Sequence, residues 1–329
     1  MKDLLNSLYE HKTLSKEEAK KVLTDIGNGM FDPMQIASFL TVFNVRSITI
    51  NELQGFREAM IALSKRVDLS DFDPIDIVGT GGDGKDTFNI STTAALVVAG
   101  AGINVAKHGN YGVSSGCGSS NVLEYLGVPF HDNEEGLRQQ LETAGFCMMH
   151  APLFHPAMKH VAPIRKALKV RTFFNILGPL INPASPKKHL LGVFNLETLR
   201  LYGYLFQRTD HRYSIIHALD GYDEISLTGS AKIIDNEGEK MVKPADFGFP
   251  TAAPEQLAGG ESIEASAKIL VSILKNEASD VLKNTVLANA TLAIQCAKPG
   301  TSQADALGMA QASLTSGKAY DVLQKSIKK

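Results

Sequence analysis

The sequence has little cysteine, no long apolar run and no excess of positive charge. Its three cysteines, Cys117, Cys147 and Cys296, are odd in number and widely spaced, which disfavours a paired disulfide framework or a CxxC metal site and fits a reducing compartment. No apolar run approaches the roughly 18 residues of a membrane span, and acidic residues interrupt the amino terminus where a signal peptide needs an apolar stretch. We therefore expect a cytoplasmic protein that makes no membrane contact.

Charge is nearly balanced, with 33 lysine and arginine residues against 35 aspartate and glutamate residues and a formal net charge of −2. A chain without a global positive field is poorly suited to bind nucleic acid. We therefore expect no nucleic-acid partner. The length of 329 residues, of which 44% are hydrophobic, predicts a globular protein of about two domains with ample core.

The first 66 residues predict a module of four short helices, because apolar residues recur along them at helical spacing. Such helices need side chains that bind the free amides of their first turn. Three patterns mark the expected helix starts: Ser15 with Glu18, Asp32 before Pro33, and Thr49 with Glu52.

Beyond residue 74 the pattern changes to short apolar strands that alternate with helices, which is typical of an α/β domain. The expected strands are 75–78, 103–106, 146–149, 189–194 and 213–219, and the expected helices are 91–100, 119–126, 261–276, 279–297, 302–316 and 317–327. Residues 225–242 have the pattern of antiparallel strands, at 225–227, 231–234 and 240–242. The predicted fold class is therefore α/β: a small helical domain, and a large domain whose central sheet is mixed, mostly parallel and flanked by helices.

The strongest local signal is DIVGTGGDGKDTFNIST at residues 76–92, where a buried strand leads through glycines into a helix. Free amides and the dipole at the start of a helix favour an anion such as phosphate. Gly79, Gly81 and Gly84 also fit the dinucleotide pattern GxGxxG, but the next strand ends in Lys107 rather than in an acid for the ribose. We therefore reject a nicotinamide site and predict a phosphate site, with a glycine turn that binds no ligand as the alternative.

A second glycine loop, KHGNYGVSSGCGSSN at residues 107–121, also follows a strand and precedes a helix. Lys107 offers a point charge for a phosphate, and Ser115 and Ser119 offer hydroxyl donors. A flexible surface loop is the alternative interpretation. Two such loops on adjacent strand ends indicate a ligand with two phosphorylated ends.

Two further segments carry candidate chemistry. Asp223 and Glu224 are adjacent carboxylates suited to magnesium, although a bare Asp-Glu pair is more often a solvated acidic turn. Residues 150–183 carry His155 and Arg165 among apolar residues, where an arginine could bind the carboxylate of an aromatic acid. His155 taken alone is more often a structural histidine than a catalytic base.

Together these motifs resemble those of the anthranilate phosphoribosyltransferase family. The matching segments, which extend over nearly the whole chain, are DIVGTGGD with TFNIST, KHGN followed by VSS, HPAMK, RTFFNILGPLINP, GYDE and Leu287-Ala288-Asn289-Ala290. The resemblance implies a glycosyltransferase, specifically a pentosyltransferase, that transfers phosphoribosyl from 5-phosphoribosyl 1-diphosphate to the amine of anthranilate with Mg²⁺ and releases pyrophosphate. This is the second step of tryptophan synthesis from chorismate.

The resemblance also implies a homodimer whose subunits each contain two domains. The helical domain comprises 1–66, with 163–185 packing onto it, and the α/β domain, which binds phosphoribosyl diphosphate, comprises 67–162 and 186–329. The implied contacts to phosphoribosyl diphosphate are Gly79, Gly82, Asp83, Thr87, Asn89, Ser91, Thr92, Lys107 and Ser119. The implied contacts to anthranilate are Gly79, His108, Asn110, His155, Arg165 and Gly178, and the implied magnesium ligands are Ser91, Asp223 and Glu224.

The sequence departs from the family pattern at a few positions. Tyr111 stands where the family usually has arginine after KHGN, residues 117–121 replace an SGSAD-like stretch, and Ala218 replaces a glycine. Two other functions remain as alternatives. A pyrimidine nucleoside phosphorylase shares the fold but lacks the combination of KHGN and FNILGPL, and a noncatalytic nucleic-acid-binding relative should be more basic.

Overall fold

The computed structural model describes residues 1–112 and 116–327, which divide into two compact units. A helical unit consists of 1–66 and 151–185, and an α/β unit consists of 67–150 and 186–329. The segment that joins the helical unit thus begins at Ala151, whereas the sequence assigned 151–162 to the α/β domain. The reason is that β3 ends at His150, so the chain leaves the sheet there and continues at once as short helices.

The helical unit contains the four helices expected from the sequence and several short helices from the second segment. The α-helices are α1 (Lys2–Tyr9), α2 (Lys16–Gly27), α3 (Pro33–Val45), α4 (Ile50–Ala62), α8 (Ala151–Phe154), α9 (Ala162–Leu168) and α10 (Phe174–Leu177), and the 3₁₀ turns are η2 (Pro156–His160) and η3 (Gly178–Leu180). The predicted caps at Ser15, Asp32 and Thr49 are confirmed, because each side chain accepts a hydrogen bond from the first turn of its helix.

Aromatic rings from both segments form the core of the helical unit. Phe173 stacks on Phe56 with ring centroids 4.5 Å apart, and meets Phe43 edge-on at 5.1 Å. Phe39 completes the cluster and is fully buried. Since aromatic pairs contribute beyond their buried area, these rings explain why residues 151–185 fold with the amino-terminal helices.

A buried ion pair fixes the entry into α4. Glu52 is fully buried and accepts hydrogen bonds from Arg46 and from the backbone N–H of Leu14. Burial alone would raise the pKa of Glu52, but the Arg46 guanidinium and the backbone donors outweigh it and hold the pKa below its usual value. The Glu52 carboxylate therefore remains charged and joins three segments of the helical unit.

The α/β unit is built on a seven-stranded sheet with the order β3-β2-β1-β4-β5-β6-β7. The strands are β1 (Ile75–Gly79), β2 (Val105–Gly109), β3 (Phe146–His150), β4 (Lys188–Gly192), β5 (Arg212–Ala218), β6 (Ala231–Asp235) and β7 (Gly238–Val242). Strands β1 to β5 are parallel, whereas β6 and β7 form an antiparallel hairpin on β5. The predicted mixed, mostly parallel sheet is confirmed.

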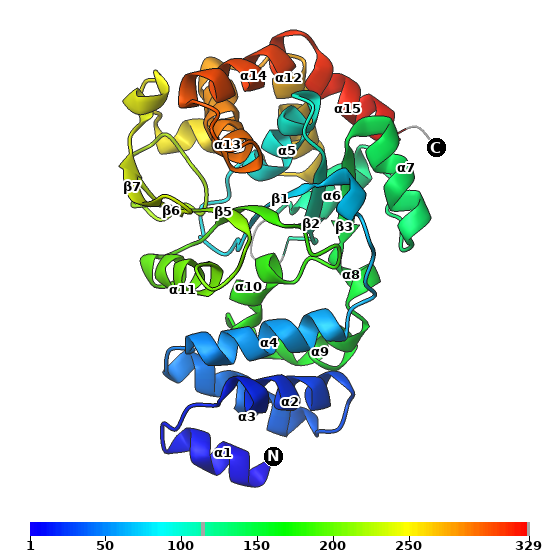
Figure 1. The fold of residues 1–329 in the computed structure, drawn as a ribbon, viewed down its shortest axis with the longest axis vertical. Coiled ribbons are helices and arrows are strands. Elements are labelled where there is room, and N and C mark those ends of the chain that lie inside the picture. The colour runs from blue at the N-terminus through cyan, green and yellow to red at the C-terminus, as the bar shows by residue number, and fades with distance from the viewer. Residues whose placement is uncertain (113–115, 328–329) are drawn as a thin grey trace. The chain divides into compact units, whose positions relative to one another are not determined.

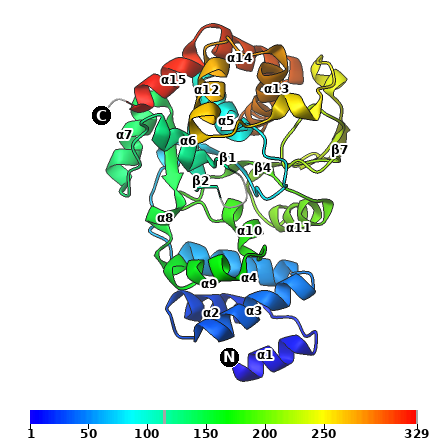
Figure 2. The same cartoon turned by 180° about the vertical axis from the view of Figure 1, so that it is seen from behind.

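Helices cover the sheet, and some of them were not expected. The α-helices are α5 (Ile90–Gly100), α6 (Ser119–Tyr125), α7 (Glu134–Ala144), α11 (Leu196–Phe206), α12 (Ile263–Leu274), α13 (Asp280–Ala297), α14 (Gln303–Thr315) and α15 (Lys318–Ile327), with 3₁₀ turns η1 (Ser70–Phe72), η4 (Pro244–Phe247) and η5 (Pro254–Leu257). Figure 1 shows α13 and α11 on opposite sides of β5, and Figure 2 shows α12 beside α6 and α15 beside α7. The sequence analysis missed α7 and α11. Within 1–112 and 116–327, every helix is too short or too polar to cross a membrane.

The strand expected at residues 225–227 is wrong. This segment pairs with none of the described strands and runs as an irregular loop between β5 and β6. Leu227 lies at a φ of +61°, which interrupts an extended chain. The three residues are nevertheless buried, so their pattern reflects a buried loop beside the acid pair.

Candidate active site

Most of the predicted site residues lie at one edge of the α/β sheet. Strands β1, β2, β4 and β5 are parallel, so their carboxyl ends meet at the same edge, where open sheets of this type bind ligands. The residues at these ends, or in the loops and helix starts that follow them, are Gly79, Gly82, Asp83, Thr87, Asn89, Ser91, Thr92, Lys107, His108, Asn110, Ser119, Asp223 and Glu224.

The two glycine loops are held together by polar contacts. The side-chain amide of Asn89 donates to the carbonyl oxygen of Cys117 at 3.0 Å, and the backbone N–H of Gly116 donates to the Asp86 carboxylate at 3.4 Å. The two predicted phosphate loops therefore lie side by side. Residues 113–115, which include the Ser115 predicted to donate a hydroxyl, lie outside the described residues.

The first glycine loop depends on backbone conformations that favour glycine. Gly81, Gly82 and Gly84 have φ values of +60°, +72° and +75°, which side chains rarely adopt. The far end of the loop is pinned, because the N–H of Phe88 donates to the carbonyl of Leu257 at 2.9 Å. The loop can thus present several amides toward a ligand ahead of α5, as an anion site requires.

The acid pair, Asp223 and Glu224, reaches across the sheet edge to this first loop. Asp223 Oδ2 accepts the backbone N–H of Gly81 at 2.7 Å, and Glu224 Oε1 accepts the N–H of Ser91 at 2.8 Å. Ser91 lies in the first turn of α5, where N–H groups lack partners within the helix. The structure therefore brings Ser91, Asp223 and Glu224 together, as the sequence analysis expected of magnesium ligands.

Two facing glycines make room for the acid pair. Gly79 and Gly192 are partners in the register of β1 and β4. A Cβ atom on Gly79 would lie 2.4 Å from the Asp223 carboxylate, and one on Gly192 would lie 1.6 Å from the Asp223 carbonyl oxygen. Both distances are far below van der Waals contact, so Asp223 can occupy this place only if both positions are glycine.

Burial changes the charge balance of this edge. Asp223 is 7% exposed, and burial raises its pKa to about 6, with a further contribution from Asp83. Burial and the neighbouring Asp223 raise the pKa of Glu224 to about 8. Two neighbouring carboxylates of like charge, one buried and one half-buried, favour a proton or a metal cation between them.

Lys107 is the buried cation of the site. It is 2% exposed, and its ammonium group donates to the carbonyl of Ile77 and approaches the Ser91 hydroxyl at 3.5 Å. Burial lowers its pKa, while Asp76, Glu224 and Asp223 oppose that shift. Lys107 is therefore held by the base of the first loop rather than extended into solvent.

The donor set suits a hard divalent cation. Each carboxylate of the acid pair can still bind a cation, since its oxygens carry more lone pairs than the one hydrogen bond from a backbone N–H group uses. Asp223, Glu224 and Ser91 also line a cavity with about 10 Å³ of free space. Within the described parts of the chain, no three His, Cys, Asp or Glu side chains group as metal ligands. The arrangement of Asp223, Glu224 and Ser91 around this cavity fits Mg²⁺, which commonly binds one or two carboxylates together with substrate phosphates and water.

The second loop presents Asn110 and Ser119. The carbonyl oxygen of Asn110 accepts the N–H of Ser120 at 3.1 Å and the hydroxyl of Ser119 at 3.4 Å. His108 is buried, and its backbone N–H donates to Asp76 Oδ1 at 3.0 Å. Asn110 is exposed at the strand end and available to a ligand.

The other predicted anthranilate contacts, His155, Arg165 and Gly178, belong to the helical unit. Arg165 Nη2 donates to Asn175 Oδ1 at 3.3 Å, and the guanidinium lies over the Phe174 ring at 5.4 Å. Burial lowers the pKa of Arg165, and burial lowers the pKa of His155 to about 4. His155 is therefore neutral near pH 7. Gly178 begins the turn η3, and among the described residues no atom outside its chain neighbours lies within 4 Å of where its Cβ would be.

Sequence reasoning missed three residues that build the site. Gly192 makes room for Asp223, Asp76 receives the N–H of His108, and Asn289 of α13 holds the backbone beside Glu224. Asp76 and Asn289 lie within the motifs DIVGTGGD and Leu287-Ala288-Asn289-Ala290, but the sequence alone assigned neither residue a role. Gly192 ends a strand that was expected to continue to residue 194, so a glycine inside that pattern was the available signal.

Comparisons with known proteins cover the whole chain. The family model described as glycosyl transferase family, helical bundle domain, matches residues 2–64, and the one described as glycosyl transferase family, a/b domain, matches residues 72–320. The anthranilate phosphoribosyltransferase of Cytophaga hutchinsonii is 56% identical over 328 residues, which cover 100% of both chains. That of Christiangramia forsetii is 54% identical over 325 residues, covering 99% of this chain and 98% of the relative.

Solved structures agree with this relationship. The crystal structure of anthranilate phosphoribosyltransferase from Thermus thermophilus matches with a TM-score of 0.92 and 35% identity, covering 98% of both chains. The Saccharomyces cerevisiae enzyme in complex with PRPP and Mg matches with a TM-score of 0.91 and 26% identity, covering 98% of this chain and 95% of that one. The two-unit fold and the glycine-loop site define a glycosyl transferase. Within that class, the chain belongs to the anthranilate phosphoribosyltransferase family.

Replacing Gly192 with alanine should displace the acid pair. The added methyl group would overlap the Asp223 carbonyl oxygen, and overpacking of this kind typically costs about 1–3 kcal/mol. We expect a clear loss of unfolding free energy in denaturant titrations. The matched control is Gly308→Ala, at an exposed position in α14 with nothing within 4 Å of the new Cβ, which should be neutral or stabilising. Equal stability of the two variants would contradict the steric argument.

Proposed function

We propose that this chain is an anthranilate phosphoribosyltransferase, a pentosyltransferase of tryptophan synthesis. It transfers phosphoribosyl from 5-phosphoribosyl 1-diphosphate to the amine of anthranilate and releases pyrophosphate. Identities of 54–56% over essentially the full length of relatives with this name support the activity. The observation that carries it in the structure is the meeting of the acid pair with both ends of the first glycine loop, at Gly81 and Ser91.

The sugar diphosphate binds at the edge of the α/β sheet. The N–H groups of Thr80, Gly81 and Ser91 already donate to Gly192, Asp223 and Glu224. The diphosphate is received by the other backbone amides of the first glycine loop and of the start of α5, because such amides are strong anion donors. Gly82, Asp83, Thr87, Asn89 and Thr92 belong to this loop and helix start, and Lys107 and Ser119 come from the neighbouring strand and loop. This assignment rests on the resemblance of the motifs and on their common place at the strand ends.

The chemistry requires no protein nucleophile. The anthranilate nitrogen forms a bond to C1 of the ribose while the bond from C1 to the diphosphate oxygen breaks, and the nitrogen then loses one proton to solvent. The chain contributes by holding both substrates in line and by stabilising the charge that collects on the leaving group. Lys107 and the loop amides are the groups placed for the second task.

We propose Mg²⁺ as the cofactor, held by Ser91, Asp223, Glu224 and oxygens of the substrate. When bound, the cation offsets the negative charge of the diphosphate and of the pyrophosphate that leaves. The raised pKa values of Asp223 and Glu224 support this proposal, because a nearby cation would relieve the cost of keeping two neighbouring carboxylates charged. The S. cerevisiae relative has been solved in complex with PRPP and Mg.

Anthranilate binding is proposed for Gly79, His108, Asn110, His155, Arg165 and Gly178. A partly buried arginine beside an aromatic ring suits an aromatic carboxylate, since the guanidinium can bind the acid bidentately. Arg165 with Phe174 provides this combination. The S. cerevisiae relative has been solved in complex with 4-fluoroanthranilate.

The alternatives are less well supported. A pyrimidine nucleoside phosphorylase would use inorganic phosphate without a divalent cation and has no need of the acid pair. A noncatalytic nucleic-acid-binding role conflicts with the net charge of −2.

The cytoplasmic location remains a prediction. Cys117, Cys147 and Cys296 form no disulfide within the described residues.

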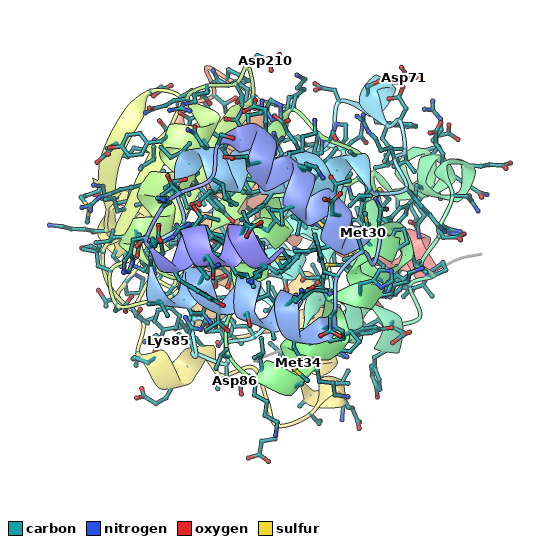
Figure 3. All side chains as sticks on the ribbon, turned by 90° about the horizontal axis from the view of Figure 1, so that it is seen from below. Met30, Met34, Asp71, Lys85, Asp86 and Asp210 are labelled. Carbon is teal, nitrogen blue, oxygen red and sulfur yellow. The ribbon has the colours of Figure 1, made fainter. Side chains whose placement is uncertain are left out.

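We also propose a homodimer that forms through the helical unit. Met30 and Met34, labelled in Figure 3, are 66% and 77% exposed, and Val45 of the same unit is 75% exposed. Met34→Asp should therefore shift the sedimentation coefficient from dimer toward monomer. Met241→Asp, at an exposed methionine of the α/β unit, is the control and should leave it unchanged. A monomeric wild-type protein would refute the proposal.

Anthranilate fluorescence tests the proposed activity directly. With purified protein, 5-phosphoribosyl 1-diphosphate and Mg²⁺, the signal should fall over time, and it should stay constant with EDTA or without the sugar diphosphate. Asp223→Asn should lower turnover at limiting Mg²⁺ by about tenfold or more and recover partly at high Mg²⁺. Asp220→Asn, three residues away on the exposed part of the loop, should retain the wild-type Mg²⁺ dependence. No signal loss in any mixture would refute the transferase function.

Arg165→Ala should weaken anthranilate binding selectively. Losing a charge-assisted hydrogen bond costs about 1.5–3 kcal/mol, so KM for anthranilate should rise roughly 10-fold to 100-fold. KM for 5-phosphoribosyl 1-diphosphate should change little. Lys166→Ala, which removes an exposed neighbouring charge, serves as the control in steady-state kinetics. An unchanged anthranilate KM would remove Arg165 from the pocket.

A further inference from the structure

The loop that carries the acid pair is fixed from several sides. Residues 219–230 run between β5 and β6 as irregular chain. At its start, the N–H of Ala218 donates to the carbonyl of Tyr222 at 3.0 Å, and at its end the carbonyl of Leu227 accepts the N–H of Ala252 at 2.9 Å. Between these points stand Asp223 and Glu224, whose side chains are held by the first glycine loop and the start of α5. The backbone immediately after Glu224 needs a separate partner.

Asn289 supplies that partner from the middle of α13. Its Nδ2 donates to the carbonyl oxygen of Ile225 at 2.8 Å, and its Oδ1 accepts the N–H of Ile225 at 3.0 Å. Nδ2 also donates to the carbonyl of Thr285 in its own helix at 2.9 Å. Both backbone groups of Ile225 are therefore paired with one side chain that lies 64 residues away in the sequence.

The cost of burying Asn289 indicates a specific purpose. The residue is 3% exposed, and its neighbours Ala288 and Ala290 are fully buried and apolar. A buried amide is tolerated only when its polar atoms are paired, because an unpaired one costs free energy. Both amide hydrogens of Asn289 are used, and two of its three contacts go to the residue next to Glu224.

We propose that Asn289 is a positioning residue that holds the acid pair in the geometry that Mg²⁺ and the substrate diphosphate require. Asn289 lines the same small cavity as Ser91, Asp223 and Glu224. When both are charged, the two adjacent carboxylates repel each other, and the hydrogen bonds from Asn289 to Ile225 keep the backbone from relieving that repulsion by moving outward. This role rests on the proposed function, in which the acid pair serves the metal and its substrate.

The test uses Asn289→Ala in the full chain, with Mn²⁺ and pyrophosphate as the probe. Partners that orient metal ligands typically change metal affinity by about 10–100-fold when they are mutated. We expect electron paramagnetic resonance titrations to show Mn²⁺ binding weakened within that range. In kinetics, the Mg²⁺ concentration for half-maximal activity should rise in parallel. KM for anthranilate should stay within about twofold, because the Asn289 side chain contacts Ile225 and its own helix and none of the residues proposed to bind anthranilate.

Thr291→Val is the matched control. Thr291 is fully buried on the same helix, and its hydroxyl donates to the carbonyl of Leu287 within α13. Its replacement removes a buried polar group without touching the acid loop, so stability should fall while Mn²⁺ affinity stays at the wild-type value. If Asn289→Ala fails to fold, Asn289→Ser takes its place, since the hydroxyl can pair with only one group of Ile225.

Equal Mn²⁺ affinity in wild type and Asn289→Ala would overturn the proposal, and so would a wild-type chain that binds no Mn²⁺ with pyrophosphate. Loss of affinity in Thr291→Val as well would also overturn it, because the effect would then belong to the helix as a whole. The binding titration requires no turnover. A wild-type chain that binds Mn²⁺ but transfers no phosphoribosyl group would therefore refute the proposed function while leaving the role of Asn289 testable.

Discussion

The close approach of Asp223 to two facing glycines is the constraint on which the site depends. Gly79 and Gly192 end two neighbouring parallel strands in register, and the Asp223 backbone occupies the space that a side chain on Gly192 would fill. This position brings the carboxylate of Asp223 within hydrogen-bond distance of the Gly81 N–H. Glu224, the next residue, accepts a hydrogen bond from the Ser91 N–H. The absence of a side chain at these two positions thus decides where the carboxylate oxygens of the acid pair lie relative to the first glycine loop.

The electrostatic character of the site follows from this position of Asp223. Asp76, Asp223 and Glu224 surround one buried cation, Lys107, so the pocket for a highly anionic substrate is itself rich in carboxylates. Burial raises the pKa of both members of the acid pair, and the attraction of Lys107 for Asp223 is too weak to offset it. Under the proposed function, a divalent ion that enters with the diphosphate would offset the charge of the carboxylates and of the diphosphate at once, and would add to the attraction from Lys107 and the loop amides.

Local patterns predicted the elements that depend on nearby residues. The caps at Ser15, Asp32 and Thr49 and the mixed parallel sheet follow from short motifs and from strand order. The grouping of Ser91 with the acid pair was implied by the family resemblance, and the two do meet in the structure. What could not be predicted depends on distant contacts. Residues 151–162 join the helical unit although β3 precedes them directly, the 225–227 segment is buried without joining a described strand, and Asn289 finds its partner 64 residues away. The helices α7 and α11 begin at asparagine caps, Asn133 and Asn195, and were overlooked despite that local signal.

Tyr111 shows how this chain departs from its family without losing the site. Its hydroxyl donates to Glu124 at 3.1 Å, and its ring meets His150 edge-on with centroids 4.8 Å apart. Where the family usually has an arginine, the second loop here is fastened to α6 and to the end of β3 by a neutral side chain. The loop therefore offers one positive charge fewer to a ligand. Under the proposed function, phosphate binding by this loop relies on Lys107 and on backbone amides, and the cation proposed at the acid pair neutralises a larger share of the ligand's charge.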